Sequence, residues 1–379
     1  MQNDFIYLDN NATTPLDPRV LASMMPYLTD MFGNAASSHK MGRQIKTAVE
    51  QARGQVGELL DVNEEDIYFT AGATEAINIA LQGIPARAGQ AKHIITVQTE
   101  HPAVLDTCRY LETIGVEVTY LSVDDTGLID FEELKQAFQD NTVLVCVMFV
   151  NNETGVIQDL TKIADIAHER GALFMTDATQ GVGKFPLYVP GKIDILAFSA
   201  HKFYGPKGIG GLYVNPYVRL KSLVYGGGHE RGLRSGTLNV SGIVGLGKAA
   251  EIAQQEILRD EGRISQLRAQ LEEALLQIPG TRINGAVENR LSSTSNICFD
   301  GVDNEAMLLG LKDICVSNGS ACHSLVMEPS HVLLAMGLTK EQANSSIRFS
   351  LGRFNTEEEI KHTADAVSNA VARLRAMAF

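Results

Sequence analysis

The sequence is poor in cysteine, with five in 379 residues: Cys108, Cys146, Cys298, Cys315 and Cys322. An odd and sparse set of thiols argues against a disulfide framework. It favours a reducing, cytoplasmic environment.

Long hydrophobic runs and excess positive charge are also missing. The longest apolar run, 143–150, has eight residues, whereas a membrane-spanning helix needs roughly 20. The N-terminus has no basic stretch followed by an apolar one, so no secretory signal is predicted. Lys and Arg number 32 against 45 Asp and Glu, a net charge of −13. This balance excludes a general nucleic-acid or anionic-membrane binder, because both require a basic surface.

The residues that are present favour a large folded protein. Hydrophobic residues make up 45% and charged residues 20% of the chain, and its length suggests about two domains. Apolar runs alternate with helical patterns over most of the first 215 residues, which predicts an α/β fold with a mostly parallel sheet flanked by helices. The predicted strands are 66–70, 93–98, 116–123, 143–150, 172–176, 193–199 and 210–214, and the helices are 74–81, 102–113, 131–138 and 160–170.

The C-terminal third has a different pattern. A helix is predicted over 242–276, followed by shorter strands and a last helix that opens with a capping box, Thr356 with Glu359. We expect a large domain over 15–255 and a smaller α+β domain over 256–379, against which 1–14 pack.

Two loops at strand ends carry candidate ligand-binding residues, since ligands of such sheets bind beyond the carboxyl ends of the strands. Residues 71–75 (AGATE) follow a strand and open a helix; they form either a phosphate-binding turn or an ordinary one. His101 follows the next strand and either stacks on a planar ring or is structural.

Two further strand ends carry Asp177 and Lys202. Each of these two residues has a non-catalytic alternative, namely a structural ion pair or a solvated charge in a loop. Together with the phosphate-binding turn, an aspartate for a ring nitrogen and a lysine for a Schiff base describe a site for pyridoxal 5′-phosphate (PLP).

Two other patterns do not support a site. Residues 242–249 (GIVGLGKA) resemble the Walker A nucleotide-binding motif, but Ala249 occupies the position at which that motif has a Ser or Thr that binds magnesium. Cys315, Cys322, His323 and His331 lack structural zinc spacing, so no metal site is predicted.

Cys322 differs from the other four cysteines. It lies in a small, polar segment, 317–324 (SNGSACHS), beside His323. There it is either a reactive thiol or a surface thiol of no consequence. The other four lie in apolar patterns and are expected to be buried and inert.

The chain closely resembles the NifS/IscS-type cysteine desulfurases, in the class V aminotransferase group of fold-type I PLP enzymes. The matching segments run in order along the chain. They are YLDNNATTPLDPRV, FTAGATEA, TEHPAVLDTC, VNNETGVIQ, TDATQGVGK, FSAHKFYGPKGIGGLYV, GGGHERGLRSGTLN, SNGSAC and SSIRFSLGRFNTEEEI.

The resemblance implies a role for each matching site residue. Lys202 would bind PLP and act as a base on the substrate, and His101 would stack on the ring and move protons. Asp177 would pair with the ring nitrogen and Gln180 with the phenolate oxygen. The phosphate would be held by Ala73, Thr74, Ser199, His201 and, from the partner subunit of a homodimer, Thr237.

The resemblance also implies the substrate side and the reaction. Asn152 would contact cofactor and substrate, and Arg348 would bind the carboxylate of L-cysteine. Cys322, on a loop of the small domain, would capture sulfur as a persulfide while L-alanine is released. An acceptor protein would then take the sulfur for iron–sulfur cluster or other thio-product biosynthesis. The alternatives are a selenocysteine lyase and a desulfurase dedicated to tRNA or DNA sulfur modification.

Overall fold

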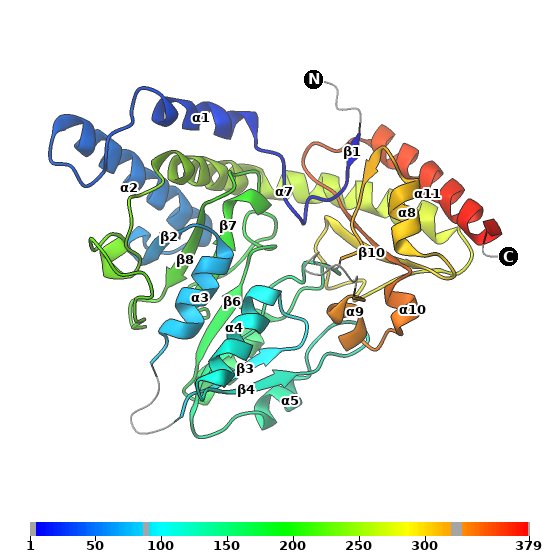
Figure 1. Ribbon diagram of the computed structural model, residues 1–379, viewed down its shortest axis with the longest axis horizontal. Helices are drawn as coiled ribbons and strands as arrows, with labels where there is room; N and C mark the ends of the chain where they lie inside the picture. Colours follow the sequence, from blue (N-terminus) through cyan, green and yellow to red (C-terminus); the bar gives the residue numbers. More distant parts are fainter. Residues whose placement is uncertain (1–4, 86–90, 320–327, 378–379) are drawn as a thin grey trace.

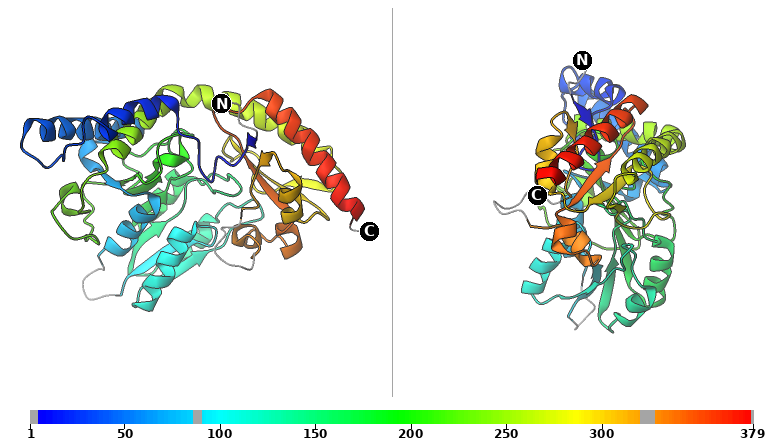
Figure 2. Two further views of the ribbon diagram at one scale, coloured as in Figure 1. Left: turned by 45° about the horizontal axis from the view of Figure 1, so that its top comes forward. Right: turned by 90° about the vertical axis from the view of Figure 1, so that its right-hand side faces the viewer.

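The computed structural model describes residues 5–85, 91–319 and 328–377. Its elements form two bodies joined by one long helix, α7 (Val240–Leu276), which runs across both (Figures 1 and 2). None of the helices in the described ranges has the length and hydrophobicity that crossing a bilayer requires.

A seven-stranded sheet forms the centre of the larger body. From edge to edge it contains β2 (Ile67–Thr70), β8 (Gly210–Val214), β7 (Ile195–Ser199), β6 (Leu173–Asp177), β5 (Thr142–Cys146), β3 (His93–Val97) and β4 (Glu117–Leu121). All neighbouring strands are parallel except β8, which is antiparallel to both of its neighbours. The predicted α/β class with a mostly parallel sheet is confirmed.

Helices cover both faces of this sheet. One face packs against α3 (Ala73–Gly83) and α4 (Pro102–Thr113). The other face packs against α1 (Pro18–Leu28), α2 (Lys40–Leu60), α6 (Leu160–Glu169) and the first half of α7. Most strands are therefore buried on both sides, which explains why their sequences are continuously apolar. The short α5 (Phe131–Gln136) follows β4.

The strand predicted over 143–150 is shorter in the structure, because β5 ends at Cys146. Beyond it, the Val147 N–H still donates to Met175 O and the Phe149 N–H to Asp177 O, both in β6. The Met148 N–H instead donates to the buried Glu100 carboxyl. A side chain thus replaces a ladder partner, and the chain leaves the sheet and enters the cavity described below.

The smaller body contains a three-stranded antiparallel sheet. Its strands are β9 (Thr281–Ile283), β10 (Thr294–Phe299) and β12 (Ser346–Ser350), and its helices are α8 (Asn304–Gly310), α9 (His331–Ala335), α10 (Lys340–Ala343) and α11 (Glu357–Met377). The capping box predicted at the start of α11 is present, with Thr356–Glu359 hydrogen bonds of 3.1 and 3.2 Å.

The N-terminal segment belongs spatially to the smaller body. β1 (Ile6–Tyr7) pairs in parallel with β11 (Ile314–Cys315), and Leu8 packs in the core formed by α7, β10, β12 and α11. The domain limits at 255 and 256 stay a prediction, since α7 runs through them without a break.

The run that resembles a nucleotide-binding loop lies inside α7. A Cβ atom at Gly245 would lie 2.7 Å from Met24 Sδ in α1, and one at Gly247 would lie 2.6 Å from Ala52 Cα in α2. These glycines let three helices approach closely, and the pattern reflects helix packing.

Candidate active site

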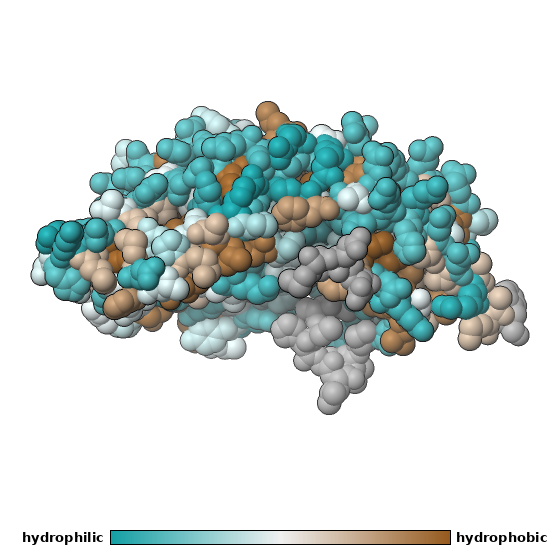
Figure 3. Space-filling view, turned by 90° about the horizontal axis from the view of Figure 1, so that it is seen from above, coloured by the Kyte–Doolittle hydropathy of each residue, from teal (hydrophilic) through white to brown (hydrophobic). Residues whose placement is uncertain are grey.

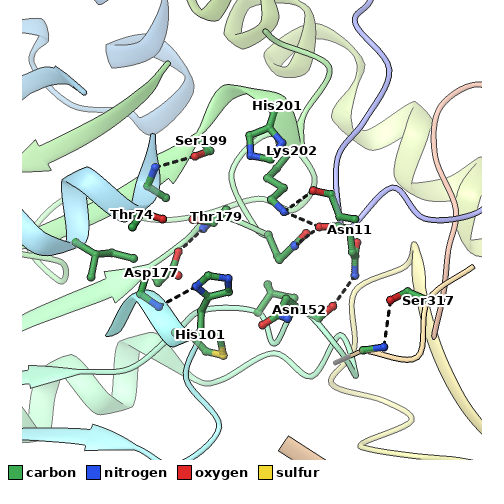
Figure 4. A pocket seen from close by; sticks show the side chains of 18 of the residues that line it. Asn11, Thr74, His101, Asn152, Asp177, Thr179, Ser199, His201, Lys202 and Ser317 are labelled. Carbon is green, nitrogen blue, oxygen red and sulfur yellow. Dashed lines mark hydrogen bonds between the residues drawn. The ribbon is translucent and has the colours of Figure 1, made fainter. Parts of the chain in front are cut away.

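A cavity of about 330 Å³ lies at the carboxyl ends of the parallel strands, where the N-terminal segment and the smaller body meet the large sheet (Figure 4). Ten residues that the sequence singled out line this cavity. They are Ala73, Thr74, His101, Asn152, Asp177, Gln180, Ser199, His201, Lys202 and Arg348.

One end of the cavity is formed by the start of α3. Ser199 Oγ accepts a hydrogen bond of 2.7 Å from the Ala73 N–H. A Cβ atom at Gly210 in β8 would lie only 2.7 Å from Gly72 Cα, so glycine there lets the sheet and this turn approach closely. Backbone N–H groups at the start of a helix, together with the Thr74 and Ser199 hydroxyls, form an arrangement suited to a phosphate group.

His201 lies beside this end and is neutral near pH 7. Its Nδ1 is 3.1 Å from Thr13 Oγ1. Burial, followed by the nearby charge of Lys202, lowers the pKa of the imidazole to about 4. A neutral imidazole can donate one hydrogen bond to an anion through a ring N–H.

Lys202 projects into the cavity toward the N-terminal segment (Figure 4). Its Nζ donates to Asn11 O at 2.7 Å and to Ala12 O at 2.8 Å. Burial, helped by the positive charge of Arg348, lowers the pKa of this amine to about 8. About a tenth of the amine is then neutral at pH 7, which is the form that attacks an aldehyde.

Asp177 is buried, with 5% of its surface exposed. Its Oδ1 accepts a 2.9 Å hydrogen bond from the Thr179 N–H. Within the ranges that the structure describes, Asp177 takes part in no salt bridge, although Lys202 is close enough to be influenced by its charge. A buried carboxylate without a paired cation is costly, so this position suits the protonated ring nitrogen of a bound ligand.

His101 and Gln180 are held in fixed orientations around the same space. His101 Nδ1 accepts a 3.1 Å hydrogen bond from the Ala103 N–H, which places the proton of the neutral ring on Nε2. Gln180 Nε2 donates to Asn11 O at 2.9 Å, and Lys184 Nζ donates to Gln180 Oε1 at 2.8 Å. The second N–H of the Gln180 amide is left to serve a ligand oxygen.

These features together fit PLP. The phosphate would lie at Ala73, Thr74, Ser199 and His201, the ring nitrogen at Asp177, and the aldehyde carbon at Lys202. The buried carboxylate of Asp177 is the feature that most needs such a cation.

Arg348, from β12, lines the opposite side of the cavity and is 5% exposed. Its Nη1 donates to Asn152 O at 2.9 Å, and its Nη2 donates to Asp9 Oδ1 at 2.6 Å. Its Nε is buried without a hydrogen-bond partner, and each terminal nitrogen has a second N–H. The guanidinium can therefore still bind a carboxylate with two parallel hydrogen bonds.

The four described cysteines are free. Burial raises the pKa of Cys108 to about 12 and that of Cys298 to about 11, and it also raises the pKa values of Cys146 and Cys315. Cys108, Cys146 and Cys298 are buried, as predicted, whereas Cys315 is half-buried. Near pH 7 all four are protonated thiols and poor nucleophiles.

Cys322 and His323 lie outside the described residues. The described chain that leads to them reaches the cavity, because Ser317 and Gly319 line it and are joined by a 3.1 Å hydrogen bond from the Gly319 N–H to Ser317 Oγ. Thr237 is exposed and does not line the cavity of its own chain.

The sequence reasoning gave no role to Asn11, Ala12, Thr179 or Asp9, although all of them contact site residues. Asn11 and Ala12 contact Lys202 through backbone carbonyl groups, which leave no signal in residue type, and the Asn11 side chain also donates to Asn152 O at 3.2 Å. The one signal for them in the sequence is that Asp9, Asn11 and Ala12 lie in the family-like segment YLDNNATTPLDPRV.

Comparison with known proteins shows where the chain belongs. The aminotransferase class-V family model matches residues 6–362. The cysteine desulfurase IscS of Pasteurella multocida (strain Pm70) is 52% identical over 377 residues, covering 98% of this chain and 93% of the relative.

Two solved structures are also similar to it. A NifS-like protein superposes with a TM-score of 0.91 at 36% identity, over 97% of this chain and 100% of its own. SspA in complex with cysteine superposes with a TM-score of 0.81 at 36% identity, over 93% and 100% of the two chains. The chain therefore belongs to the class-V aminotransferase family and, within it, to the PLP-dependent cysteine desulfurases, which confirms the fold, activity and cofactor that the sequence resemblance implied.

Proposed function

We propose that this enzyme converts L-cysteine to L-alanine and captures the sulfur on Cys322. The observation that carries the proposal is one cavity that is lined by Lys202, whose pKa is lowered, by Asp177, which has no salt bridge within the described residues, and by Arg348. Ser317 and Gly319, which precede Cys322 in the sequence, line the same cavity. When bound, PLP supplies an electron sink that weakens bonds at the substrate carbon atoms.

Residues of the chain bind the substrate and transfer its protons. Arg348 binds the substrate carboxylate, and Asn152, whose backbone carbonyl accepts a hydrogen bond from Arg348, lines the same cavity and contacts cofactor and substrate. Lys202, as a free amine of lowered pKa, takes the proton from the substrate Cα. His101 carries its proton on Nε2 and assists proton movement.

The sulfur transfer step balances without a further reactant. The Cys322 thiolate attacks the substrate sulfur, so that an S–S bond forms and the Cβ–S bond breaks. The electron pair of that bond stays with the carbon, which takes up a proton and becomes the methyl group of alanine. The persulfide then passes to the thiol of an acceptor protein.

A stoichiometry experiment tests this reaction. The purified enzyme is mixed with L-cysteine in a single turnover, alanine is quantified, and the persulfide is mapped by mass spectrometry of alkylated peptides. We expect one alanine per persulfide, located on Cys322. A persulfide on Cys108, Cys146, Cys298 or Cys315 would refute the assignment. L-selenocysteine in the same assay distinguishes a selenocysteine lyase.

We also propose that the enzyme is a homodimer with Thr237 contributing to the partner's site. Thr237 is exposed in its own chain, and α1 with the turn after it exposes Leu21, Met25, Leu28 and Phe32. Seen from above, hydrophobic residues interrupt the hydrophilic surface in the half of the molecule that holds α1 (Figure 3). Light scattering would give the mass, and one chain per particle would contradict the dimer.

The remaining assignments are a cytoplasmic location, a PLP-binding domain over 15–255 and a small domain over 256–379. Free thiols support the location. The proposed acceptor is a protein that serves iron–sulfur cluster assembly, or one that serves tRNA or DNA sulfur modification. To distinguish these acceptors, the enzyme carrying a labelled persulfide on Cys322 is mixed with cell proteins, and the protein that receives the labelled sulfur is identified.

The lowered pKa of Lys202 predicts the pH dependence of cofactor loading. Because the neutral amine reacts, we expect the rate at which PLP-depleted enzyme takes up PLP to rise from pH 6 through about 8 and then to level off. Arg348→Gln removes a positive charge that lowers the Lys202 pKa, so the midpoint of PLP uptake in this variant should lie at a higher pH than in wild type. The absorbance of bound PLP measures uptake in both proteins, and equal midpoints would contradict an effect of the Arg348 charge.

Arg348→Lys should weaken substrate binding more than turnover. A lysine cannot form the two parallel hydrogen bonds to a carboxylate, and hydrogen bonds to charged groups contribute about 1.5–3 kcal/mol. We expect KM for L-cysteine to rise about 10–100-fold with a smaller change in kcat. Steady-state alanine release measures this, and an unchanged KM would remove Arg348 from the substrate site.

A further inference from the structure

A buried glutamate, Glu153, directly follows the substrate-side residue Asn152 and has no role in the reaction above. It is 2% exposed. Its backbone is fixed on two sides, because its N–H donates to Asn151 Oδ1 at 2.9 Å and its carbonyl accepts from Asn296 Nδ2 of β10 at 3.2 Å. The direction of its side chain is therefore set by the fold.

The carboxyl group of Glu153 touches the chain on both sides of the Cys322 segment. On the C-terminal side, the Ser330 hydroxyl donates to Glu153 Oε2. On the N-terminal side, Gly319 lies so close that a Cβ atom there would be 2.6 Å from the same oxygen. Gly319 also has a φ of +81°, so both its conformation and the space beside Glu153 require glycine.

Ser330 connects this contact to a helix. Its Oγ also accepts a 3.1 Å hydrogen bond from the Leu333 N–H and thereby caps α9. The carboxyl group of Glu153 is thus bonded to the residue that caps α9 and packs closely against Gly319.

The surroundings make the charge of Glu153 sensitive to pH. Burial raises its pKa to about 7, against the opposing effects of the Ser330 hydrogen bond and of the Arg348 charge. Arg348 approaches from β12 and is itself paired with Asp9 at 2.6 Å. The contacts from β10 and from the Asn151 turn are neutral amides.

We propose that Glu153 is a positioning residue that fixes Gly319, which lines the substrate cavity, relative to Ser330; these two described residues flank the Cys322 segment in the sequence. The consequence for catalysis rests on the proposed role of Cys322. A neutral carboxyl tolerates burial between Gly319 and Ser330, whereas an ionised one demands solvation.

The sign of the pH effect follows from linkage. Because the pKa of Glu153 is raised from 4.5 to about 7 in the folded chain, the favourable burial of the neutral group is fully present below about pH 4.5. It is lost as the pH rises through about 7. The anchoring contacts should weaken over that interval.

The test compares wild type with Glu153→Gln, which keeps the shape and stays neutral. Chymotryptic cleavage after Leu325 is followed by mass spectrometry, and the ratio of the two rates at each pH cancels the pH dependence of the protease. We expect the ratio of the wild-type rate to that of the variant to rise about fivefold or more between pH 6 and pH 8.5. A ratio that does not change with pH would overturn the proposal.

Glu100→Gln is the matched control. Glu100 is a second buried carboxyl, 0% exposed, that accepts the Met148 N–H and whose pKa is also raised by burial. Its substitution should not alter the pH dependence of cleavage after Leu325, and an effect equal to that of Glu153→Gln would also overturn the proposal. Ser330→Ala should increase cleavage at pH 6, because it removes the hydroxyl that holds α9 to the anchor.

A kinetic readout separates this inference from the proposed function. The rate of persulfide formation on Cys322 in a single turnover should fall from pH 6 to 8.5 in wild type relative to Glu153→Gln, with KM for L-cysteine unchanged. If Cys322 is not the sulfur acceptor, this readout fails while the cleavage ratio still reports on the anchor. If the ratio stays flat while persulfide forms on Cys322, the anchor alone is wrong.

Discussion

Replacing Lys202 with alanine is expected to lower L-cysteine turnover by about 10³-fold or more. The substitution removes the amine that we propose binds PLP and acts as the base at the substrate Cα, and a positioned base alone contributes about 10²–10⁴-fold. In the structure the Nζ is held by two carbonyl oxygens, Asn11 O and Ala12 O, which orient the amine without neutralising it. Alanine release and the absorbance of bound PLP measure the two losses separately.

A nearby lysine gives the control. Lys207 is exposed in the same loop and does not line the cavity, so Lys207→Ala should retain turnover within about twofold. Small primary amines added to Lys202→Ala should restore part of the Cα proton transfer, because they supply a base that fits the vacated space. Substantial turnover by Lys202→Ala without added amine would refute the role of this lysine.

The half of the cavity that lies on the large sheet was predictable from the sequence. Asp177 is the last residue of β6 and Lys202 follows β7, and the carboxyl ends of these neighbouring parallel strands meet at one edge of the sheet. The residue types indicated the ligand, since an aspartate, a lysine and a phosphate-binding turn at the start of a helix together match PLP. The order of the strands was enough to predict that these residues lie close together.

The other half depends on contacts that no sequence pattern encodes. Asn11 O reaches Lys202 from 191 residues away through a backbone atom. Arg348 is set by its pairing with Asp9, which becomes a neighbour only because β1 joins the smaller body. The early end of β5 depends on the Glu100 side chain, 48 residues from the amide that it binds. Each of these is a tertiary contact that overrides local preference.

Cys322→Ser is expected to lower persulfide formation and sulfur transfer by about 10³-fold or more. A serine hydroxyl has a pKa far above that of a thiol and does not form a stable bond with the departing sulfur. Steps that precede sulfur attack should survive, because Lys202, Asp177 and Arg348 lie in the described cavity and do not depend on the thiol. Exchange of the substrate Cα proton with deuterated water should therefore continue in the variant.

Cys315→Ser separates this effect from a general loss of structure. Cys315 lies seven residues before Cys322, is half-buried in β11, and has a pKa raised by burial, so it should remain a spectator. We expect wild-type sulfur transfer from this variant. Loss of transfer in both variants would indicate that the smaller body, and not one thiol, had been disturbed. Retained transfer in Cys322→Ser would place the nucleophile elsewhere, although the four described cysteines are held protonated by burial and are poor candidates for it.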